Sequence, residues 1–329
     1  MAGAPLVDPH GRTVRDLRIS VTDRCNLRCR YCMPAEGMDW LPRAELLTYE
    51  EIERVARVCV ERFGFDGIRL TGGEPTVRAN LPVLVAKLAA LGTDLSLTTN
   101  GATLRLLAAD LRAAGLRRIN ISLDSLRPAT FLAVTRRDAL RQVLDGIDAA
   151  VEAGLSPVKV NCVLIRGVND DEVVDFARFG RERGVTIRFI EFMPLDADDG
   201  WAPGNVVPAA EVVAAIDAVY PLDQVDGRGS APAERFRYRD GGGEIGVIAS
   251  VTQSFCGACD RVRLTAEGMF RNCLFAVRET DLRSVLRSGG SDDDVAAAIV
   301  ADVGNKWAGH SIGQVTFVRP DRSMSQIGG

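Results

Sequence analysis

Residues 25–32 read Cys-Asn-Leu-Arg-Cys-Arg-Tyr-Cys and bring together three thiols, Cys25, Cys29 and Cys32. A cubane of four irons and four sulfides is usually held by four thiolates, so three closely spaced thiolates would leave one iron open to a ligand that is not protein. The alternative is a structural zinc site, which prefers four Cys or His ligands. No further thiol lies near this first triad, and the chain has only 2 histidines. The spacing therefore favours an iron–sulfur site with an open iron.

The composition is that of an ordinary globular protein. The chain has 329 residues, of which 47% are hydrophobic and 26% charged, with a net charge of -4. This length suits one large domain or two modest ones, and the negative charge argues against general binding to nucleic acid or anionic membranes. The first residues lack a signal-peptide core, and no apolar run reaches membrane-spanning length. We therefore expect a cytoplasmic protein, in which clustered cysteines usually bind metal.

From residue 16 to about 195, short strands alternate with helical stretches, which is typical of a parallel sheet. The predicted strands are Leu17–Val21, Ile68–Thr71, Leu95–Thr99, Arg118–Asp124, Val158–Leu164 and Thr186–Met193. The predicted helices are Tyr49–Phe63, Leu81–Leu91 with Asn80 as its cap, Leu104–Ala114, Ala139–Ala153 and Asp171–Arg183. The two remaining cysteines, Cys59 and Cys162, share apolar faces of one helix and one strand, so we expect them in the core.

Five of these strands alternate apolar and polar side chains. The polar side includes Arg18, Arg69, Thr98, Ser122 and Lys159. A closed eight-stranded barrel fills its interior with Val, Ile and Leu, and burying unpaired polar groups would cost roughly 1–3 kcal/mol each. A two-layer sheet with one solvated face would not explain helices after every strand. We therefore expect a wide, partly open barrel of six strands whose polar face lines a ligand cavity.

A second triad of thiols lies near the C-terminus and consists of Cys256, Cys259 and Cys273. It also lacks an evident fourth thiolate, which predicts a second cluster with an open iron. A zinc site completed by His310, or a redox disulfide at the Cys-x-x-Cys, are the alternatives. Arg261 and Arg263 follow directly, and paired guanidiniums suit a phosphate or a nucleobase edge.

The stretch around 223–232 is rich in Gly and Pro and predicts a domain boundary. Beyond it, Arg235–Arg239 and Glu244–Ser250 predict a hairpin, and Leu282–Arg287 and Asp294–Asp302 predict helices. Earlier in the chain, Thr71-Gly72-Gly73-Glu74-Pro75 ends the second predicted strand, where α/β barrels place ligand sites. Its glycines would allow close backbone approach to a ligand, and its proline would fix the following turn.

Together these motifs resemble the radical S-adenosylmethionine superfamily. From Leu17 to Gly329 the chain resembles one family within it, the GTP 3′,8-cyclases or molybdenum cofactor biosynthesis proteins A. The matching segments are residues 17–25, 69–75, 97–101, 120–126, 158–161, 188–194, the second triad and 324–329. One departure is Asp260, where the family usually has Asn. The resemblance implies an α/β fold: an incomplete (βα)6 TIM-like barrel over residues 1–225, and a smaller domain over residues 226–329 that closes it.

The resemblance also assigns roles to residues of this chain. It implies that Cys25, Cys29 and Cys32 hold a 4Fe-4S cluster that binds S-adenosylmethionine, with cofactor contacts from Tyr31, Gly73, Ser122 and Met193. It implies a second 4Fe-4S cluster on Cys256, Cys259 and Cys273, whose open iron meets guanine. The implied GTP contacts are Arg18, Arg69, Thr98, Lys159, Arg261, Val262 and Arg263, with Arg188 nearby. The family's C-terminal tail enters the active site, which here would bring in Gly328 and Gly329.

The implied activity is the radical cyclisation of GTP to (8S)-3′,8-cyclo-7,8-dihydroguanosine 5′-triphosphate, the first step of molybdenum cofactor biosynthesis. The implied partners are an electron donor such as flavodoxin or ferredoxin and a downstream cyclic pyranopterin monophosphate synthase, and the chain is expected to be a monomer or homodimer. One alternative is a peptide-modifying maturase, which usually has more C-terminal cysteines. Another is an iron–sulfur electron carrier, which would need neither a polar barrel nor open irons.

Overall fold

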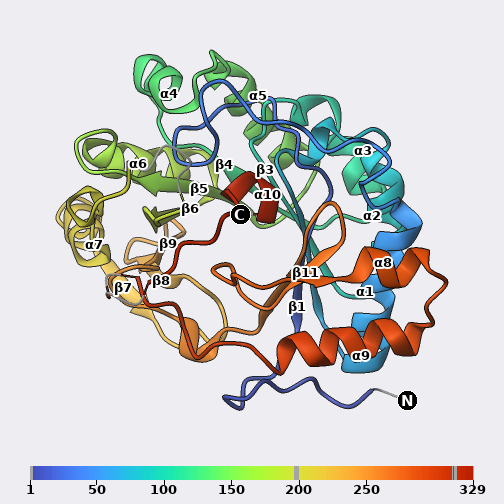
Figure 1. The fold of residues 1–329 in the computed structure, drawn as a ribbon. Helices are drawn as coiled ribbons and strands as arrows, with labels where there is room; N and C mark the ends of the chain where they lie inside the picture. Colours follow the sequence, from blue (N-terminus) through green and yellow to red (C-terminus); the bar gives the residue numbers. More distant parts are fainter. Residues whose placement is uncertain (1–2, 196–199, 313, 315–316, 329) are drawn as a thin grey trace.

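The structure is a computed structural model that describes residues 3–195, 200–312, 314 and 317–328. Its centre is a curved sheet of parallel strands in chain order, with helices on its outer side (Figure 1). The strands are β1 (Asp16–Ser20), β2 (Gly67–Thr71), β3 (Asp94–Thr99), β4 (Arg118–Ser122), β5 (Val158–Leu164) and β6 (Thr186–Glu191). The helices are α1 (Tyr49–Phe63), α2 (Leu81–Ala89), α3 (Ala108–Ala113), α4 (Pro128–Thr135), α5 (Leu140–Glu152) and α6 (Val173–Arg183). The predicted α/β fold with six barrel strands is confirmed.

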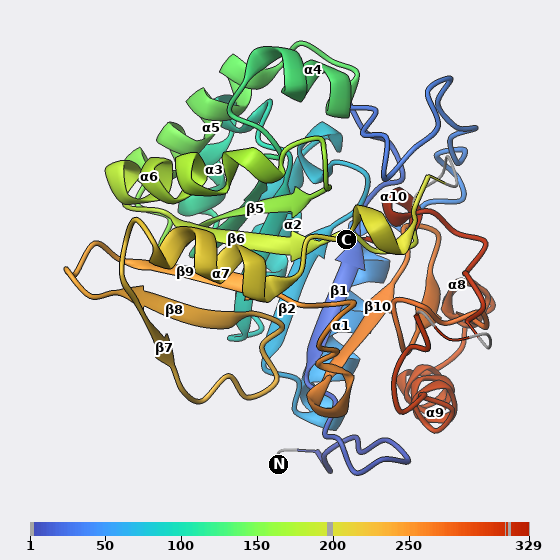
Figure 2. The ribbon, with the colours of Figure 1, turned by 90° about the vertical axis from the view of Figure 1, so that its left-hand side faces the viewer.

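The C-terminal half lengthens this sheet at both edges (Figure 2). At one edge β10 (Arg261–Leu264) pairs parallel with β1 and is followed by β11 (Met269–Arg271) and β12 (Thr280–Asp281). At the other edge β9 (Glu244–Ile248) pairs parallel with β6, and β8 (Glu234–Tyr238) and β7 (Leu222–Val225) follow. One 12-stranded sheet therefore runs through the described residues, across the predicted boundary near residue 225. That boundary stays a prediction.

The helices bury their apolar faces against the outer side of the sheet. Helix α1 begins with a capping box between Thr48 and Glu51 and ends at Gly64, whose φ of 69° suits the left-handed turn that glycine favours. Cys59 on α1 and Cys162 on β5 are both fully buried in the hydrophobic core, as predicted. The alternation along the strands thus separates a dry outer face from a polar inner face.

Several local expectations need correction. The stretch predicted as one helix over Leu104–Ala114 is a 3-10 turn over Leu104–Leu106 followed by α3. Helices α4 and α7 (Ala209–Asp217) were not predicted. Asn80 precedes α2 but adopts a left-handed φ of 60° and makes no capping hydrogen bond, whereas side-chain capping normally needs an extended backbone at that position.

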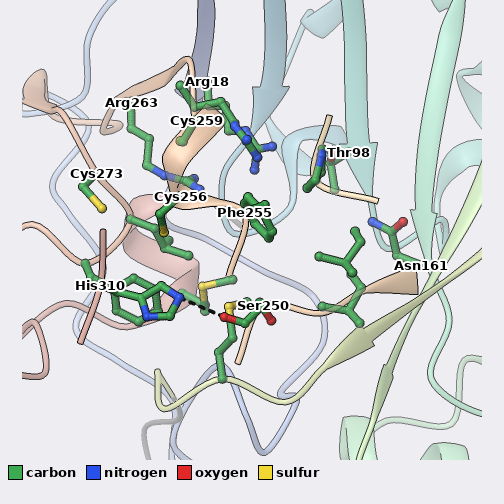
Figure 3. Close-up of a pocket in the computed structure, with 18 of the residues that line it drawn as sticks. Arg18, Thr98, Asn161, Ser250, Phe255, Cys256, Cys259, Arg263, Cys273 and His310 are labelled. Carbon is green, nitrogen blue, oxygen red and sulfur yellow. Dashed lines mark hydrogen bonds between the residues drawn. The ribbon is translucent and has the colours of Figure 1, made fainter. Parts of the chain in front are cut away.

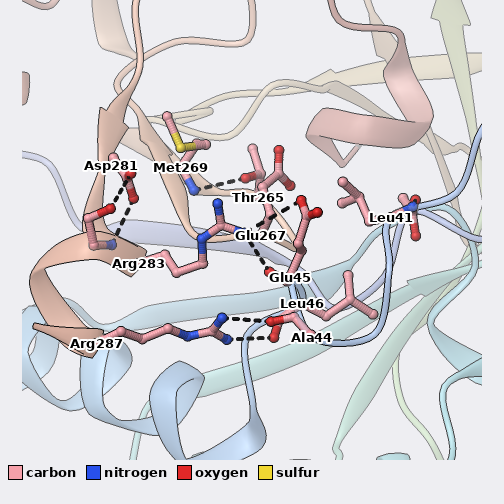
Figure 4. Close-up of polar contacts among 12 residues, drawn as sticks. Leu41, Ala44, Glu45, Leu46, Thr265, Glu267, Met269, Asp281, Arg283 and Arg287 are labelled. Atoms are coloured by element: carbon pink, nitrogen blue, oxygen red, sulfur yellow. Dashed lines mark hydrogen bonds and ion pairs between the residues drawn. The ribbon is translucent and has the colours of Figure 1, made fainter.

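The C-terminal half also fixes the loop that follows the first triad. Arg287, at the end of α8 (Leu282–Arg287), donates to the carbonyl oxygens of Ala44 at 2.7 Å and Leu46 at 2.9 Å, and Arg283 donates to that of Glu45 at 3.0 Å (Figure 4). The residues predicted as helix Asp294–Asp302 belong to a longer helix, α9 (Asp292–Val303). Among all the helices described, not one has the length and apolar character needed to cross a lipid bilayer.

Candidate active site

A cavity lies inside the curve of the sheet and takes its walls from both halves of the chain. The barrel strands contribute Arg18, Arg69, Thr98, Asn161 and Arg188, and the C-terminal half contributes Phe255, Cys256, Cys259, Arg261, Arg263, Cys273 and His310 (Figure 3). The cavity therefore brings together the second triad and five arginines. The expected cavity inside the barrel is present, and Met193, just beyond the end of β6, also lines it.

Strand register explains how three of these arginines come together. Arg18 on β1 lies opposite Arg263 on β10 and opposite Arg69 on β2, so three guanidiniums form a row across adjacent parallel strands. Because residues in register point to the same face of a sheet, all three side chains reach the cavity.

These arginines carry positive charge that the protein compensates poorly. Burial, reinforced by neighbouring guanidiniums, lowers the pKa of Arg18 to about 9, and burial lowers that of Arg69 to about 10. Burial and the neighbouring guanidinium of Arg18 lower the pKa of Arg263 to well below its usual range. Within the described residues, the Nε atoms of Arg18 and Arg261 lack any hydrogen-bond partner. Asp16 Oδ1 lies 3.6 Å from Arg18 Nε and Asp260 Oδ1 lies 3.5 Å from Arg261 Nε. Two carboxylates thus face the five guanidiniums of the cavity, and the excess of positive charge suits an anion.

Arg188 is held by two amides on neighbouring strands. Its Nε donates to Asn161 Oδ1 at 2.9 Å, and its Nη2 donates to Asn120 Oδ1 at 2.6 Å. Asn120 in turn donates to Thr98 Oγ1 at 3.3 Å. Asn120 and Asn161 had no predicted role. Both lie in register with residues of the predicted polar face, Asn120 with Thr98 and Lys159, and Asn161 with Ser122. Together they fix the direction of one guanidinium inside the cavity.

The first triad lies in the loop that follows β1. Its thiols are free and partly exposed, and those of Cys25 and Cys32 have pKa values raised to about 11 and about 12, chiefly by burial. Cys25 is close enough to raise the pKa of the other two thiols further. Three thiols gathered in this way fit an iron–sulfur cluster, because its irons supply the positive charge that keeps thiolates deprotonated.

The Gly-Gly-Glu-Pro motif packs directly on this loop. A Cβ at Gly73 would lie 2.4 Å from the carbonyl oxygens of Asp23 and Arg24, so the glycine is required by close contact with the triad loop. Glu74 accepts hydrogen bonds from the backbone of Asn100 and the hydroxyl of Thr99, both at 2.6 Å. The close neighbours of Gly73 are thus protein backbone, and its contact with a cofactor stays a prediction.

Tyr31 lies within the first triad loop, and neither Tyr31 nor Ser122 is among the residues that line the cavity. Tyr31 donates from its hydroxyl to Asp124 Oδ2 at 2.6 Å, and Asp124 Oδ1 accepts from the backbone of Val163 at 2.9 Å. Asp124 follows β4, which ends at Ser122. Sequence reasoning missed Asp124 as the partner of Tyr31, because no local pattern joins two residues so far apart in the chain.

In the second triad, Cys256 and Cys259 flank a short 3-10 turn, and Cys273 lies beyond the β10–β11 hairpin. Burial raises the pKa of Cys273, and the neighbouring Cys259 and Cys256 raise it further. Although burial also acts on Cys256, hydrogen bonds from His310 and Ser254 bring its pKa down to about 6. No three Cys, His, Asp or Glu side chains within the described ranges converge as the ligands of a single metal ion would. The second cluster stays a prediction.

The C-terminal helix α10 (Met324–Ile327) lies in the mouth of the barrel (Figure 1). Ser325 hydrogen-bonds the thiol of Cys32, while Met324 lines the cavity. Gly328, with φ of 72°, approaches β1 and β2 so closely that a Cβ would lie 2.5 Å from Thr71 Cγ2. The tail therefore enters the site as expected, whereas Gly329 lies outside the described residues.

Two predicted GTP contacts are not among the cavity-lining residues. Lys159 on β5 is half-buried, and burial together with Arg188, Arg118 and Arg69 lowers its pKa to about 8, which places it within electrostatic reach of the cavity. The Val262 side chain is fully buried in the hydrophobic core, so only its backbone could meet a nucleotide.

Comparisons with family models and solved structures assign this chain to a class of enzyme. Residues 19–180 match the family model described as the radical SAM superfamily, and residues 185–312 match Molybdenum Cofactor Synthesis C. Streptococcus suis SuiB bound to S-adenosylmethionine superposes with a TM-score of 0.55 at 12% identity, over 88% of this chain and 69% of that one. Methylornithine synthase (PylB) superposes with a TM-score of 0.51 at 16% identity, over 64% of this chain and 63% of that one. Fold and first triad together define a radical SAM enzyme.

Sequence relatives narrow this class to one family. The GTP 3′,8-cyclase of Streptomyces coelicolor is 50% identical over 328 residues, which cover 98% of this chain and 96% of that protein. Those of Rhodopirellula baltica and Mycolicibacterium smegmatis are each 49% identical, over 98% and 100% of this chain and 92% and 93% of the relatives. The chain belongs to the GTP 3′,8-cyclase family.

Proposed function

We propose that this chain converts GTP to (8S)-3′,8-cyclo-7,8-dihydroguanosine 5′-triphosphate, the first step of molybdenum cofactor biosynthesis. The observation that carries the proposal is the row of Arg263, Arg18 and Arg69, which lines one cavity together with the second triad. A triphosphate brings roughly four negative charges, and guanidiniums in a site of low effective dielectric bind them strongly. A nucleoside triphosphate therefore satisfies the charge that the protein leaves uncompensated.

The two triads have different roles in this proposal. We assign a 4Fe-4S cluster with S-adenosylmethionine to Cys25, Cys29 and Cys32, and a second 4Fe-4S cluster that meets guanine to Cys256, Cys259 and Cys273. When bound, the first cluster and its cofactor supply the radical that removes hydrogen from ribose C3′. The chain's own residues orient the nucleotide, so that C3′ faces the first triad and C8 of guanine lies within bonding reach of C3′.

Protein groups also shape the surroundings of the reacting atoms. Phe255 stacks beneath the Arg261 guanidinium, with 5.0 Å between the guanidinium carbon and the ring centroid, which fixes the direction of that cation. The tail at Gly328 covers the barrel mouth and would exclude water from the nucleotide. We further propose a cytoplasmic enzyme that takes electrons from a donor such as flavodoxin or ferredoxin and passes its product to a cyclic pyranopterin monophosphate synthase.

The test is an anaerobic assay of the reconstituted protein with S-adenosylmethionine, reductant and each nucleoside triphosphate in turn. We expect deoxyadenosine and a cyclised nucleotide from GTP, and no cyclised product from ATP, CTP or UTP. Cofactor cleavage that requires a peptide would instead indicate a maturase. Absence of any cofactor cleavage would indicate an electron carrier.

A further inference from the structure

Two buried cations lie close to the second triad and outside the nucleotide site. Lys306 is 3% exposed and Arg12 is 9% exposed, yet neither is among the residues that line the cavity. Burying a charge is costly unless it is well hydrogen-bonded, and nothing in the proposed reaction uses these two groups. The hydrogen-bond partners of Lys306 and Arg12 indicate their role.

Lys306 joins the two loops that carry Cys259 and Cys273. Its Nζ donates to the carbonyl oxygen of Arg261 at 2.8 Å and also to that of Asn272. Arg261 comes two residues after Cys259, and Asn272 immediately precedes Cys273. In the parts of the chain that the structure describes, no carboxylate forms an ion pair with Lys306. Its charge lowers the pKa of Cys273, which burial raises, and also acts on the carboxylate of Asp302.

Arg12 joins the third thiol to the segment that carries Lys306. Its Nη1 donates to the carbonyl oxygens of Cys256 at 2.6 Å and Ala308 at 2.7 Å, and its Nη2 donates to that of Trp307. Asp8 holds the guanidinium in place by accepting from its Nε at 2.5 Å. The N-terminal segment is thereby tied to the loop of Cys256.

The segment between these contacts packs tightly against the triad. A Cβ at Gly309 would lie only 2.9 Å from the Cβ of Cys256, so the chain from 306 to 309 passes directly behind this thiol. Lys306 and Arg12 thus connect the loops of Cys256, Cys259 and Cys273 to the segment 306–309. Their relative positions are therefore set by cations rather than by apolar packing alone.

We propose that Lys306 and Arg12 form a cationic clamp that holds the second triad at cluster-binding spacing and stabilises the reduced cluster. This inference rests on the second cluster of the proposed function. Three thiolates on a cubane carry excess negative charge, and one-electron reduction adds one more. A buried cation nearby favours that electron, so it shifts the reduction potential of the cluster upward. Groups that hold metal ligands in this way typically change metal affinity about 10–100-fold when removed.

The test uses the full chain carrying Cys25→Ala, Cys29→Ala and Cys32→Ala, so that only the second cluster can form. Lys306→Met is compared with Lys87→Met, which removes a surface lysine that pairs with Glu53 at 2.7 Å. Iron and sulfide retention under a chelator and the midpoint potential in an EPR-monitored titration are measured without turnover. We expect Lys306→Met to release iron about 10-fold faster and to have a more negative potential, with Lys87→Met unchanged.

The possible outcomes distinguish a failure of the clamp proposal from a failure of the second cluster to form. If the parent protein binds no cluster, the second cluster of the proposed function fails, and the clamp fails with it. If the parent binds a cluster and Lys306→Met keeps both its iron retention and its potential, the clamp alone is overturned. Faster iron loss with an unshifted potential also overturns it, because a merely structural role predicts that result. If the Lys306→Met apoprotein has a lowered melting temperature, iron and sulfide retention and the midpoint potential are measured on Arg12→Gln instead.

Discussion

Arg263 donates from Nη1 to the carbonyl oxygen of Gly328 and so ties the end of the chain to β10, the strand that follows Cys259. The same guanidinium belongs to the row with Arg18 and Arg69. The tail and the nucleotide site therefore share one cation. Any change that displaces Gly328 should disturb how the nucleotide is held.

Gly328→Ala should abolish most turnover while both clusters still assemble. The new Cβ would lie 2.5 Å from Thr71 Cγ2 and 2.6 Å from Ser20 Oγ, so the tail must move. Gly289→Ala is the matched control, because Gly289 also has a positive φ, 82°, but has open space around it. Deleting Gly328 and Gly329 should have the effect of Gly328→Ala. Full activity with either change, measured by product formation at normal iron content, would refute the role of the tail.

Lys159 should make GTP binding depend on pH. Its pKa is lowered to about 8, first by burial and then by Arg188, Arg118 and Arg69, against the opposing charge of Glu244. Above pH 8 the free protein loses this positive charge, and a bound triphosphate restores it by raising the pKa again. The affinity for GTP should therefore fall as pH rises through 8, and GTP binding near pH 8.5 should be accompanied by proton uptake from the buffer.

Calorimetry in buffers of different ionisation enthalpy measures that uptake directly. Lys159→Arg keeps its charge throughout this range and should flatten the dependence. An identical pH profile in the two proteins would exclude Lys159 as its cause.

Asp260→Asn should tighten GTP binding. Asp260 Oδ1 lies 3.5 Å from Arg261 Nε, so a carboxylate sits beside a cation of the nucleotide site. Removing it frees positive charge for the triphosphate, and we expect a Kd lower by roughly 3–10-fold, with a steeper dependence on salt. Equilibrium binding at two ionic strengths measures both. Weaker binding by Asp260→Asn would mean that the carboxylate serves to orient Arg261.

Tyr31 and Asp124 should act as one unit in binding S-adenosylmethionine. Both Tyr31→Phe and Asp124→Ala remove the same 2.6 Å hydrogen bond, so each should weaken cofactor binding, and Asp124→Ala should weaken it more because the backbone of Val163 also loses its acceptor. The double variant should be little worse than either single one, with a coupling of about 0.5–3 kcal/mol in a double-mutant cycle. Additive losses, at equal iron content, would show that the two residues act separately.

The polar face of the barrel could be predicted because strand side chains alternate with a period of two. Arg18, Arg69 and Thr98 reach the cavity for that reason alone. The row that includes Arg263 could not be predicted, since it depends on β10 pairing in parallel with β1 across more than 200 residues of chain. Pairing of distant parallel strands leaves no local signature in a sequence.

Other site features depended on tertiary contacts. The resemblance led us to expect the tail in the site, but the capture of Gly328 by Arg263 required the folded chain. Phe255 lines the cavity although it reads as an ordinary loop residue, and His310, considered above only as a zinc ligand, lines it too. Gly73 of the Gly-Gly-Glu-Pro motif lies close to the backbone of Asp23 and Arg24, and Gly72 lies close to that of Thr22, a demand of packing that composition cannot reveal.

Counting iron and acid-labile sulfide in anaerobically reconstituted protein tests the central claim most directly. Two cubanes, one on each triad, predict about eight irons and eight sulfides per chain. Substituting Cys273 with alanine should lower both numbers to about four and should leave cofactor cleavage without cyclised GTP. About four irons in the unaltered chain, or zinc in place of iron at the second triad, would contradict the account.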